Sequence, residues 1–324
     1  MKLTSSGLVG RRCALLVGLT LLLGSAALAA DSESTLSGGI RLDSLDWSIA
    51  GTISGDSPNI LSELTWSDVE SYQLSLSQRS YYKRNFYVRV GINYAWIQDG
   101  TVRDSDYAED NRGTEWSRSI SESSGDKIWG TSWGVGYAFH SRRKRLSIAP
   151  ILGLSYRAQH LRISNGIQYI AEDNEIAGTP DIGPLSSQLN STYQTRWISS
   201  WLGCDLRYRF QDRAPRYSPI ELGLALEYHW ADYYAQGDWN LREDLAHPKS
   251  FQHDTLGQGI SLTGECLLEL ADHWSLALTM NYQRWSTEPG TAYFFLQNGD
   301  ITETRLNEVN WESTSLMIGL VYRL

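Results

Sequence analysis

Apolar and polar side chains alternate strictly over long parts of this chain. In FYVRVGINYAWI, residues 86–97, every second side chain from Phe86 to Trp96 is apolar, and the intervening positions include Arg89 and Asn93. A period of two puts successive side chains on opposite faces, which a strand does and a helix does not. This segment therefore predicts a β-strand with one apolar and one polar face.

The same alternation recurs along the chain. Apolar rows run through residues 129–139, 146–156, 198–208, 220–230, 260–270, 274–282 and 316–324. Two less regular strands lie around Trp47 and from Tyr72 to Leu76. With the strand at 86–97, the pattern predicts ten strands.

The faces opposite these apolar rows carry charges. They include Arg157, Asp205, Arg207, Arg209, Glu221, Glu227, Glu265 and Glu269. In a secreted β-sandwich, the alternative architecture, the charges would face water and the apolar rows would pack together. In an outer-membrane barrel the apolar rows face lipid and the charges fill the lumen.

Three further observations favour the barrel. The connections at residues 80–85, 140–145, 211–219 and 271–274 are short, whereas segments 97–127, 163–192, 235–258 and 286–312 are long. The strand number is even, and the last strand ends on Tyr322 and Leu324, resembling the signal that the barrel-assembly machinery reads. We predict an all-β fold, a ten-stranded antiparallel transmembrane β-barrel with short periplasmic turns and long extracellular loops.

The N-terminus predicts export. Basic residues precede an apolar run that is too short to span a bilayer, and Ala27-Leu28-Ala29 follows as a cleavage pattern. We expect residues 1–29 to be a signal peptide and residues 30–324 to form the barrel, located in the outer membrane of a Gram-negative bacterium. Residues 1–30 hold three basic and no acidic residues, so their removal changes the formal net charge from −9 to −12, which disfavours nucleic acid as a partner.

Aromatic residues with a polar atom are abundant: the chain has 13 Trp and 18 Tyr against 6 Phe. Such residues suit membrane interfaces. We expect aromatic girdles formed by Trp47, Trp66, Trp96, Trp129, Trp230, Trp274 and Trp285. Ten strands enclose a narrow lumen in which opposite charges pair, so a general diffusion porin is disfavoured, while a narrow channel stays open as an alternative.

The segment TVRDSDYAEDN, residues 101–111, concentrates carboxylates after the strand at 86–97. Asp104 and Asp106 are two apart, so an extended chain points both to the same face. With RDSDY, NGIQYI, YQTRW and ELGLALEYHW, the mature chain resembles the omptins, outer-membrane endopeptidases, in pattern and spacing. The resemblance implies that Asp104 and Asp106 hold a catalytic water.

The resemblance also implies an Asp–His pair shortly after the seventh strand. Simple register puts Gly237 and Trp239 at those positions. Without an imidazole there, a general base near neutral pH is missing. The nearest substitutes along the chain are Asp238, Asp244 and His247, or His253 and Asp254, and His247 is retained as a catalytic candidate.

Two other interpretations of the acidic segment stay open. It is a solvated loop, or Asp104, Asp106, Glu109 and Asp110 offer oxygen ligands to Ca²⁺. The spacing of a dedicated calcium loop is absent. We therefore predict neither a metal site nor a cofactor.

Arg162 and Arg196 fall in the lipid-facing phase near the predicted outer rim. A guanidinium binds phosphate in bidentate fashion, so the two side chains are candidates for a lipopolysaccharide phosphate site. Rim arginines that reach the interface without a specific ligand are the alternative.

The sequence thus predicts a surface barrel without a complete protease site that acts through its extracellular loops, by adhesion or by binding a peptide or host-surface ligand. Its other partners would be outer-membrane lipid and lipopolysaccharide. An active omptin-type aspartyl endopeptidase cleaving at basic residues and a narrow porin-like channel are the alternatives.

Overall fold

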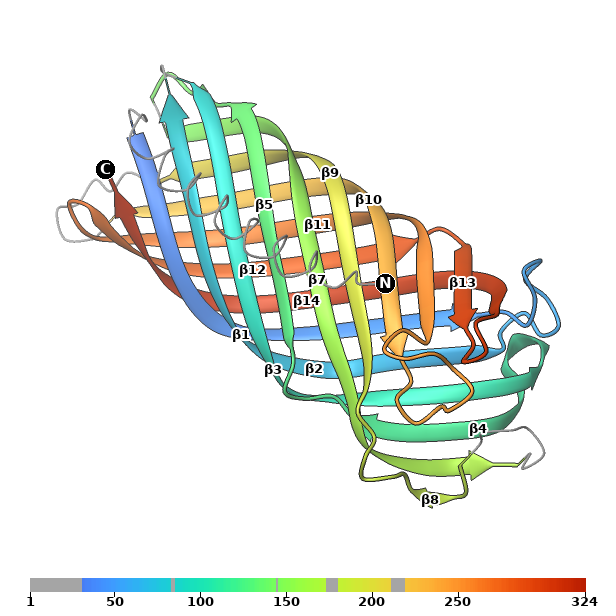
Figure 1. Cartoon of the computed structure of the whole chain (residues 1–324). Coiled ribbons are helices and arrows are strands. Elements are labelled where there is room, and N and C mark those ends of the chain that lie inside the picture. Colours follow the sequence, from blue (N-terminus) through green and yellow to red (C-terminus); the bar gives the residue numbers. More distant parts are fainter. Residues whose placement is uncertain (1–30, 83–84, 144, 173–179, 211–218) are drawn as a thin grey trace, which may run out of the picture.

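The alternating rows form one antiparallel sheet that closes on itself, as the computed structural model shows (Figure 1). The structure describes residues 31–82, 85–143, 145–172, 180–210 and 219–324. The elements are β1 (Asp31–Ile49), β2 (Ser62–Tyr82), β3 (Phe86–Glu109), the 3₁₀ turn η1 (Asp110–Arg112), β4 (Gly113–Glu122), β5 (Lys127–Tyr137), β6 (Phe139–His140), β7 (Leu146–Ala171), β8 (Gly183–Pro184), β9 (Ser191–Arg209), β10 (Ile220–Asp238), β11 (Phe251–Ala271), β12 (Trp274–Thr287), β13 (Gly290–Phe295) and β14 (Ile301–Arg323). In this part of the chain, no helix is long and apolar enough to span a bilayer.

Ten strand positions make up the ring. β4 and β5 share the position between β3 and β7, and β12 and β13 share the position between β11 and β14. The last strand pairs with the first, from Glu33 opposite Arg323 to Ile49 opposite Leu306. The predicted ten-stranded barrel is confirmed.

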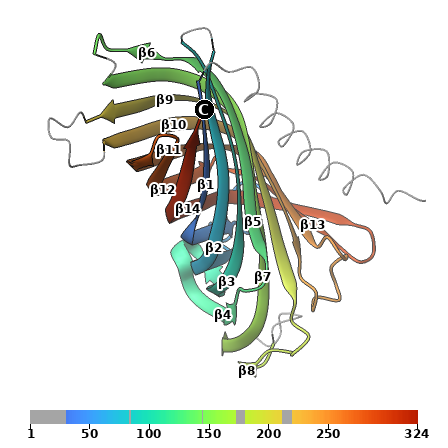
Figure 2. The ribbon, with the colours of Figure 1, turned by 90° about the vertical axis from the view of Figure 1, so that its left-hand side faces the viewer.

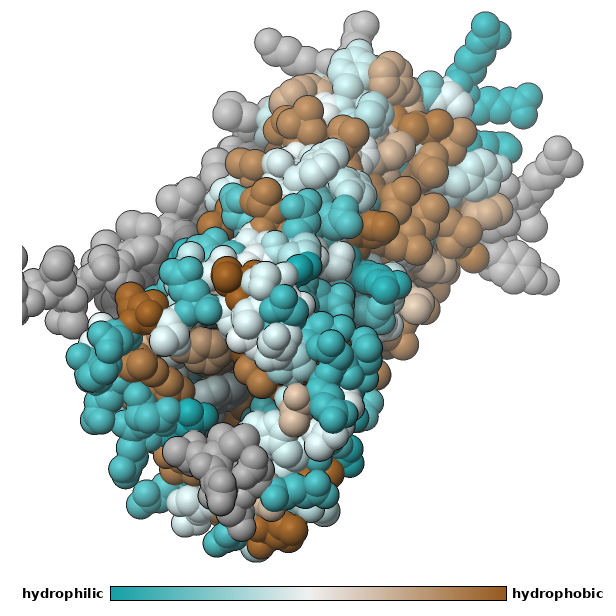
Figure 3. Space-filling model, turned by 90° about the vertical axis from the view of Figure 1, so that its right-hand side faces the viewer, coloured by the Kyte–Doolittle hydropathy of each residue, from teal (hydrophilic) through white to brown (hydrophobic). Residues whose placement is uncertain are grey.

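The apolar rows cover the outside of the barrel. Ile40, Leu152 and Ile318 are 60 %, 59 % and 62 % exposed, although each lies next to a buried residue on its strand. In a water-soluble sandwich these side chains would be buried, so the exposed rows identify the lipid-facing surface. Figure 3 views the extracellular end, where hydrophilic residues dominate, and the hydrophobic wall lies behind it.

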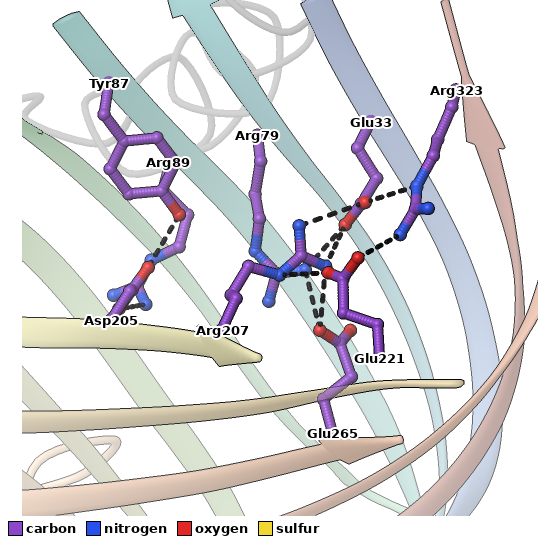
Figure 4. A network of polar contacts seen from close by, with 9 residues as sticks. All are labelled: Glu33, Arg79, Tyr87, Arg89, Asp205, Arg207, Glu221, Glu265 and Arg323. Atoms are coloured by element: carbon purple, nitrogen blue, oxygen red, sulfur yellow. Dashed lines mark hydrogen bonds and ion pairs between the residues drawn. The ribbon is translucent and has the colours of Figure 1, made fainter. Parts of the chain in front are cut away.

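The lumen of the periplasmic half is filled by ion pairs, as the sequence predicts. Arg207 contacts Glu33 at 2.8 Å, Arg79 contacts Glu265 at 2.9 Å, and Arg89 contacts Asp205 at 2.7 Å. Figure 4 shows these side chains converging from opposite walls of the barrel, together with Glu221, Arg323 and Tyr87. The charges that alternate with the lipid-facing rows therefore neutralise one another inside.

The lumen of the extracellular half is an aromatic core, which corrects the predicted girdles. Trp96, Trp230 and Trp274 do face outward, at 47 %, 53 % and 46 % exposed. Trp47, Trp66 and Trp285 are instead 3 %, 0 % and 1 % exposed inside the barrel, where they pack with Tyr193, Trp197, Tyr233, Phe251 and Trp311. Side chains thus fill both halves of the lumen.

Two of the long segments predicted as extracellular loops are largely strand. Segment 97–127 is the upper part of β3, the tight turn η1 and β4, and segment 286–312 contains β13. In Figure 1 the paired ends of β3 and β4 curve away beside β2, and in Figure 2 β4 and β8 lie at the end opposite β6 and the C-terminus. The extracellular part is therefore a raised wall of hairpins around a mouth.

Two regions named from the sequence fall mostly outside the described residues. They are the signal peptide at residues 1–29 and the connection at residues 211–219, of which only Pro219 is described.

Candidate functional site at the extracellular mouth

Asp104 and Asp106 lie on the upper part of β3, in one row with Val102. Asp104 pairs with Leu64 of β2, and Val102 pairs with Trp66. Leu64, Trp66 and Val102 are 0 %, 0 % and 1 % exposed in the aromatic core. The two carboxylates therefore point into the mouth above that core, where Figure 3 shows a hollow.

A break in the alternation produces this orientation. On β3 the lipid-facing side chains have even numbers up to Trp96, so unbroken alternation would place Asp104 and Asp106 on the outside. The register of β3 against β2 shifts twice between Ser67 and Ser71. A bulge of this kind moves later side chains to the opposite face.

The acidic pair lies beyond the exposed apolar row of β3 and thus outside the membrane-spanning part. Burial raises the pKa of Asp104 well above its ordinary value, the neighbouring Asp106 raises it further, and Arg242 lowers it. Burial also raises the pKa of Asp106, while hydrogen bonds from Ser62 and Ser117 and the charge of Arg242 lower it. Two carboxyl groups held together in a half-buried site favour retention of a proton.

Arg242 extends toward the pair from the connection between β10 and β11, on the far side of the barrel. Its guanidinium is 43 % exposed and bonds Asp244 at 2.6 and 2.8 Å. The hydrogen bond with Asp244 raises the pKa of Arg242 most, and the charges of Asp106 and Asp104 raise it further. Arg242 is not among the site residues predicted from the sequence. The feature that could have identified it is a cation in the connection after the seventh strand.

The seventh strand position, β10, offers no imidazole toward the mouth. Gly237 belongs to the inward row, and a Cβ there would lie 1.9 Å from the Phe251 ring. Trp239 packs against the same ring, with centroids 4.9 Å apart. The two positions at which the omptin resemblance requires Asp and His are thus occupied by Gly237 and Trp239, covered by an aromatic side chain.

Asp238 and His247 do form a pair, with Oδ1 and Nδ1 2.6 Å apart. Asp238 follows the outward row of β10, however, and the other ring nitrogen of His247 lies 3.1 Å from the Arg242 carbonyl oxygen. Both ring nitrogens of His247 are therefore engaged by partners within or next to the connection after β10, and neither contact is made with the acidic pair.

His253 and Asp254 do not form a catalytic pair. His253 is 0 % exposed in the aromatic core, where its Nδ1 lies 2.9 Å from the Tyr193 hydroxyl oxygen. Burial lowers the pKa of His253 to about 3. Asp254 is adjacent on β11 and exposed on the opposite face. His253 is therefore a neutral core residue.

Arg162 and Arg196 face outward on β7 and β9, both exposed. Arg162 pairs with Thr192, whereas Arg196 pairs with Ala158, so the two arginines lie four residues apart along the sheet. At about 3.3 Å per residue, their backbones are separated by roughly 13 Å along the sheet. Arg196 stacks on Tyr234 at 4.1 Å and borders an outer groove of about 1160 Å³ lined by Trp129, Tyr156, Ile198 and Trp230.

The acidic segment does not form a calcium loop. Asp110 accepts a hydrogen bond from the Asn59 backbone at 2.8 Å, and Glu109 is exposed. Among the described residues, no group of three or more His, Cys, Asp or Glu side chains is arranged to hold a metal ion.

A closed ten-stranded barrel with an apolar outer face, a charged lumen and an acidic mouth defines an integral outer-membrane protein of Gram-negative bacteria. The chain belongs to the Protochlamydia outer membrane protein family, whose model matches residues 35–324.

A solved structure supports the same fold. The outer membrane protease OmpT from Escherichia coli matches with a TM-score of 0.74 at 12 % identity, covering 91 % of this chain and 97 % of OmpT. The translocator domain of the autotransporter NalP from Neisseria meningitidis matches with a TM-score of 0.36 at 11 % identity over 98 % of both chains. No curated protein sequence matches the chain. The OmpT match confirms the omptin-like barrel, and at this identity it shows the fold alone.

Proposed function

We propose that this protein is a surface receptor-like barrel whose mouth binds cationic groups of peptides without cleaving them. The observation that carries the proposal is the placement of Asp104 and Asp106 in the mouth, while Gly237 and Trp239, at the positions where the omptin resemblance requires an acid and an imidazole, lie against the Phe251 ring. Two carboxylates attract a cation, but proton abstraction from water needs a base with a free lone pair. His247 contacts Asp238 and the Arg242 carbonyl oxygen, and His253 is buried in the aromatic core, so neither imidazole contacts the acidic pair.

The effect of Arg242 on the acidic pair is evidence that the mouth suits a cationic ligand. This guanidinium from the opposite wall lies close enough to both aspartates to lower the pKa of each. An arginine or lysine side chain of a peptide would be attracted by the same two carboxylates. The hairpin wall of β3–β4 provides the surrounding contact surface.

The proposal is tested with protein refolded in detergent containing lipopolysaccharide and a fluorescent Arg-Arg peptide. We expect binding by anisotropy and an intact peptide by mass spectrometry. Charge-assisted hydrogen bonds contribute about 1.5–3 kcal/mol each, so the double change Asp104→Asn and Asp106→Asn should weaken binding at least roughly tenfold. Glu303→Gln, an exposed carboxylate on β14, is the matched control. Cleavage that depends on Asp104 would replace this proposal by the endopeptidase alternative, and absence of both binding and cleavage would reject both.

A second proposed role, lipopolysaccharide recognition, has its own observation. Arg196 stands at the edge of the outer groove, whose floor is apolar, and Arg162 lies roughly 13 Å away along the sheet. This spacing favours two separate phosphate contacts flanking acyl chains in the groove. Arg162→Gln and Arg196→Gln should each reduce the stabilisation that added lipopolysaccharide gives to thermal unfolding in detergent. Equal stabilisation of both variants and the parent protein would contradict this role.

A further inference from the structure

The barrel contains a polar cavity between the aromatic core and the ion pairs of Figure 4, separate from the mouth. Its volume is about 190 Å³. Four guanidinium groups line it, those of Arg41, Arg79, Arg89 and Arg157. Space for several waters, at about 30 Å³ each, is thus surrounded by hydrogen-bond donors.

Three of these arginines are neutralised by direct ion pairs. Arg41 contacts Asp43 at 2.7 Å, Arg79 contacts Glu33 at 2.8 Å, and Arg89 contacts Asp205 at 2.7 Å. Among the described residues, Arg157 has no carboxylate within 4 Å. It donates to the Gln283 amide oxygen at 2.9 Å and to the Ser155 hydroxyl, and it stacks over the Trp285 ring at 4.6 Å. Its second terminal nitrogen makes no hydrogen bond to these described residues.

Other donors without partners surround Arg157. Asn93, Gly130 and Arg157 are in register on the inward face of β3, β5 and β7. Residue 130 is glycine, and the side chains of Asn93 and Arg157 pack close to it. The Asn93 amide nitrogen lies 3.5 Å, and Arg157 Cγ 3.3 Å, from the position that a Cβ of residue 130 would occupy. The buried Ser132 hydroxyl, next along β5 and also lining the cavity, has no partner in the described structure.

The carboxylates that line the cavity are already bound. Glu227 contacts Arg89 and, at 3.0 Å, His229, and Glu265 contacts Arg79 at 2.9 Å. Arg89 pairs with two carboxylates, Asp205 and Glu227, so this cluster has one excess negative charge that offsets the positive charge of Arg157 at a distance. The cluster does not supply a hydrogen-bond acceptor to the free donors of Arg157, Asn93 and Ser132. Buried donors without acceptors are costly.

We propose that this cavity binds a small inorganic anion of halide size, held by Arg157, Asn93 and Ser132. A desolvated anion accepts several donors at once, and a guanidinium is weakly hydrated and suited to buried contacts with anions. The anion enters during folding, before the aromatic core and the ion pairs close the lumen. It stabilises the walls formed by β3, β5 and β7.

The test uses the full chain, refolded in detergent in sodium bromide or in sodium gluconate at equal ionic strength. Crystals from bromide should show an anomalous peak inside the cavity beside Arg157. The thermal midpoint should rise saturably with bromide but not with gluconate. Arg157→Met should abolish both effects, whereas Arg284→Met, at an exposed position on the outer face of β12, should keep them.

If Arg157→Met does not fold, Ser132→Ala and Asn93→Ala serve as milder variants, each expected to lower the occupancy of the peak. Bromide peaks on the outer surface only would mean adventitious ions and overturn the proposal. Ordinary water at the site, or a peak that persists in all three variants, would also overturn it.

Discussion

At the scale of single residues, the acidic pair makes stability depend on pH in an unusual direction. The folded-state pKa of Asp104 is raised, so the folded protein holds its proton more tightly than the unfolded chain does. Stability contributed by the protonated group is therefore complete below the ordinary aspartate pKa, about 3.9, and is lost as pH rises through the raised value.

Asp104→Asn removes this loss. We expect the variant and the parent protein to unfold at similar temperatures in acid, and the variant to unfold at higher temperature once pH exceeds the raised pKa. Thermal scans in detergent across pH measure the difference, with Glu303→Gln as the control that should show no such trend. A variant less stable than the parent at neutral pH would mean that the carboxylate of Asp104 stabilises the fold.

Arg242 gives a second prediction at this scale. Its charge lies near both aspartates and competes with any cation that enters the mouth. Arg242→Gln should therefore bind the Arg-Arg peptide more tightly, by roughly threefold to tenfold for about 1 kcal/mol of lost competition at a partly exposed site. Arg284→Gln, at an exposed outer position 68 % accessible, should leave the dissociation constant unchanged. Weaker binding by Arg242→Gln would indicate that Arg242 holds the peptide.

At the scale of strands, alternation predicts which side of the wall a residue faces only as long as the register is unbroken. Trp47 and Trp285 have odd numbers on strands whose lipid-facing residues have even numbers, so strict alternation places both in the lumen. The predicted girdles rest on the position of these residues near strand ends and not on this alternation. Trp66 has an even number and is still inside, because the irregularity at residues 67–70 moves it across.

The acidic pair shows the same limit. The spacing of Asp104 and Asp106 predicts that their side chains lie on the same face of the strand. That this face points into the barrel depends on the bulge. The approach of Arg242 depends on how the connection after β10 folds. The placement of Gly237 at one of the two positions where the omptin resemblance requires an acid or an imidazole could be predicted, because β10 keeps its register up to Gly237 against both neighbouring strands. Local periodicity therefore accounts for the barrel and for half of the site.

The lipid-facing rows make a prediction for one strand. Ile318 lies in the middle of the apolar row of β14, at 62 % exposed. Ile318→Arg should cost about 2–4 kcal/mol of unfolding free energy in lipid vesicles, because a charge at the bilayer midplane is poorly solvated. Thr302→Arg, exposed at the extracellular end of the same strand, should cost less than about 1 kcal/mol. Equal costs at the two positions would place the bilayer elsewhere on the barrel.

At the scale of the whole molecule, two different fillings close the lumen. The ion pairs connect β1, β2, β9, β10, β11 and β14 across the periplasmic half. The aromatic core links opposite walls in the extracellular half: Trp197 of β9 lies 5.4 Å from Trp285 of β12 and 6.3 Å from Trp311 of β14, between ring centroids. The polar cavity lies between these two layers.

This layering predicts that the barrel does not conduct ions. In planar bilayers we expect no stepwise current, because an ion would have to displace aromatic side chains that are at most 1 % exposed, such as Trp66, Trp197 and Trp311. Trp197→Ala should cost about 3–5 kcal/mol of unfolding free energy and still leave the pore closed, since Trp285 and Trp311 remain stacked at 5.7 Å. Discrete conductance steps in the parent protein would show that the aromatic core opens in the membrane, and would favour the narrow-channel alternative over a closed receptor.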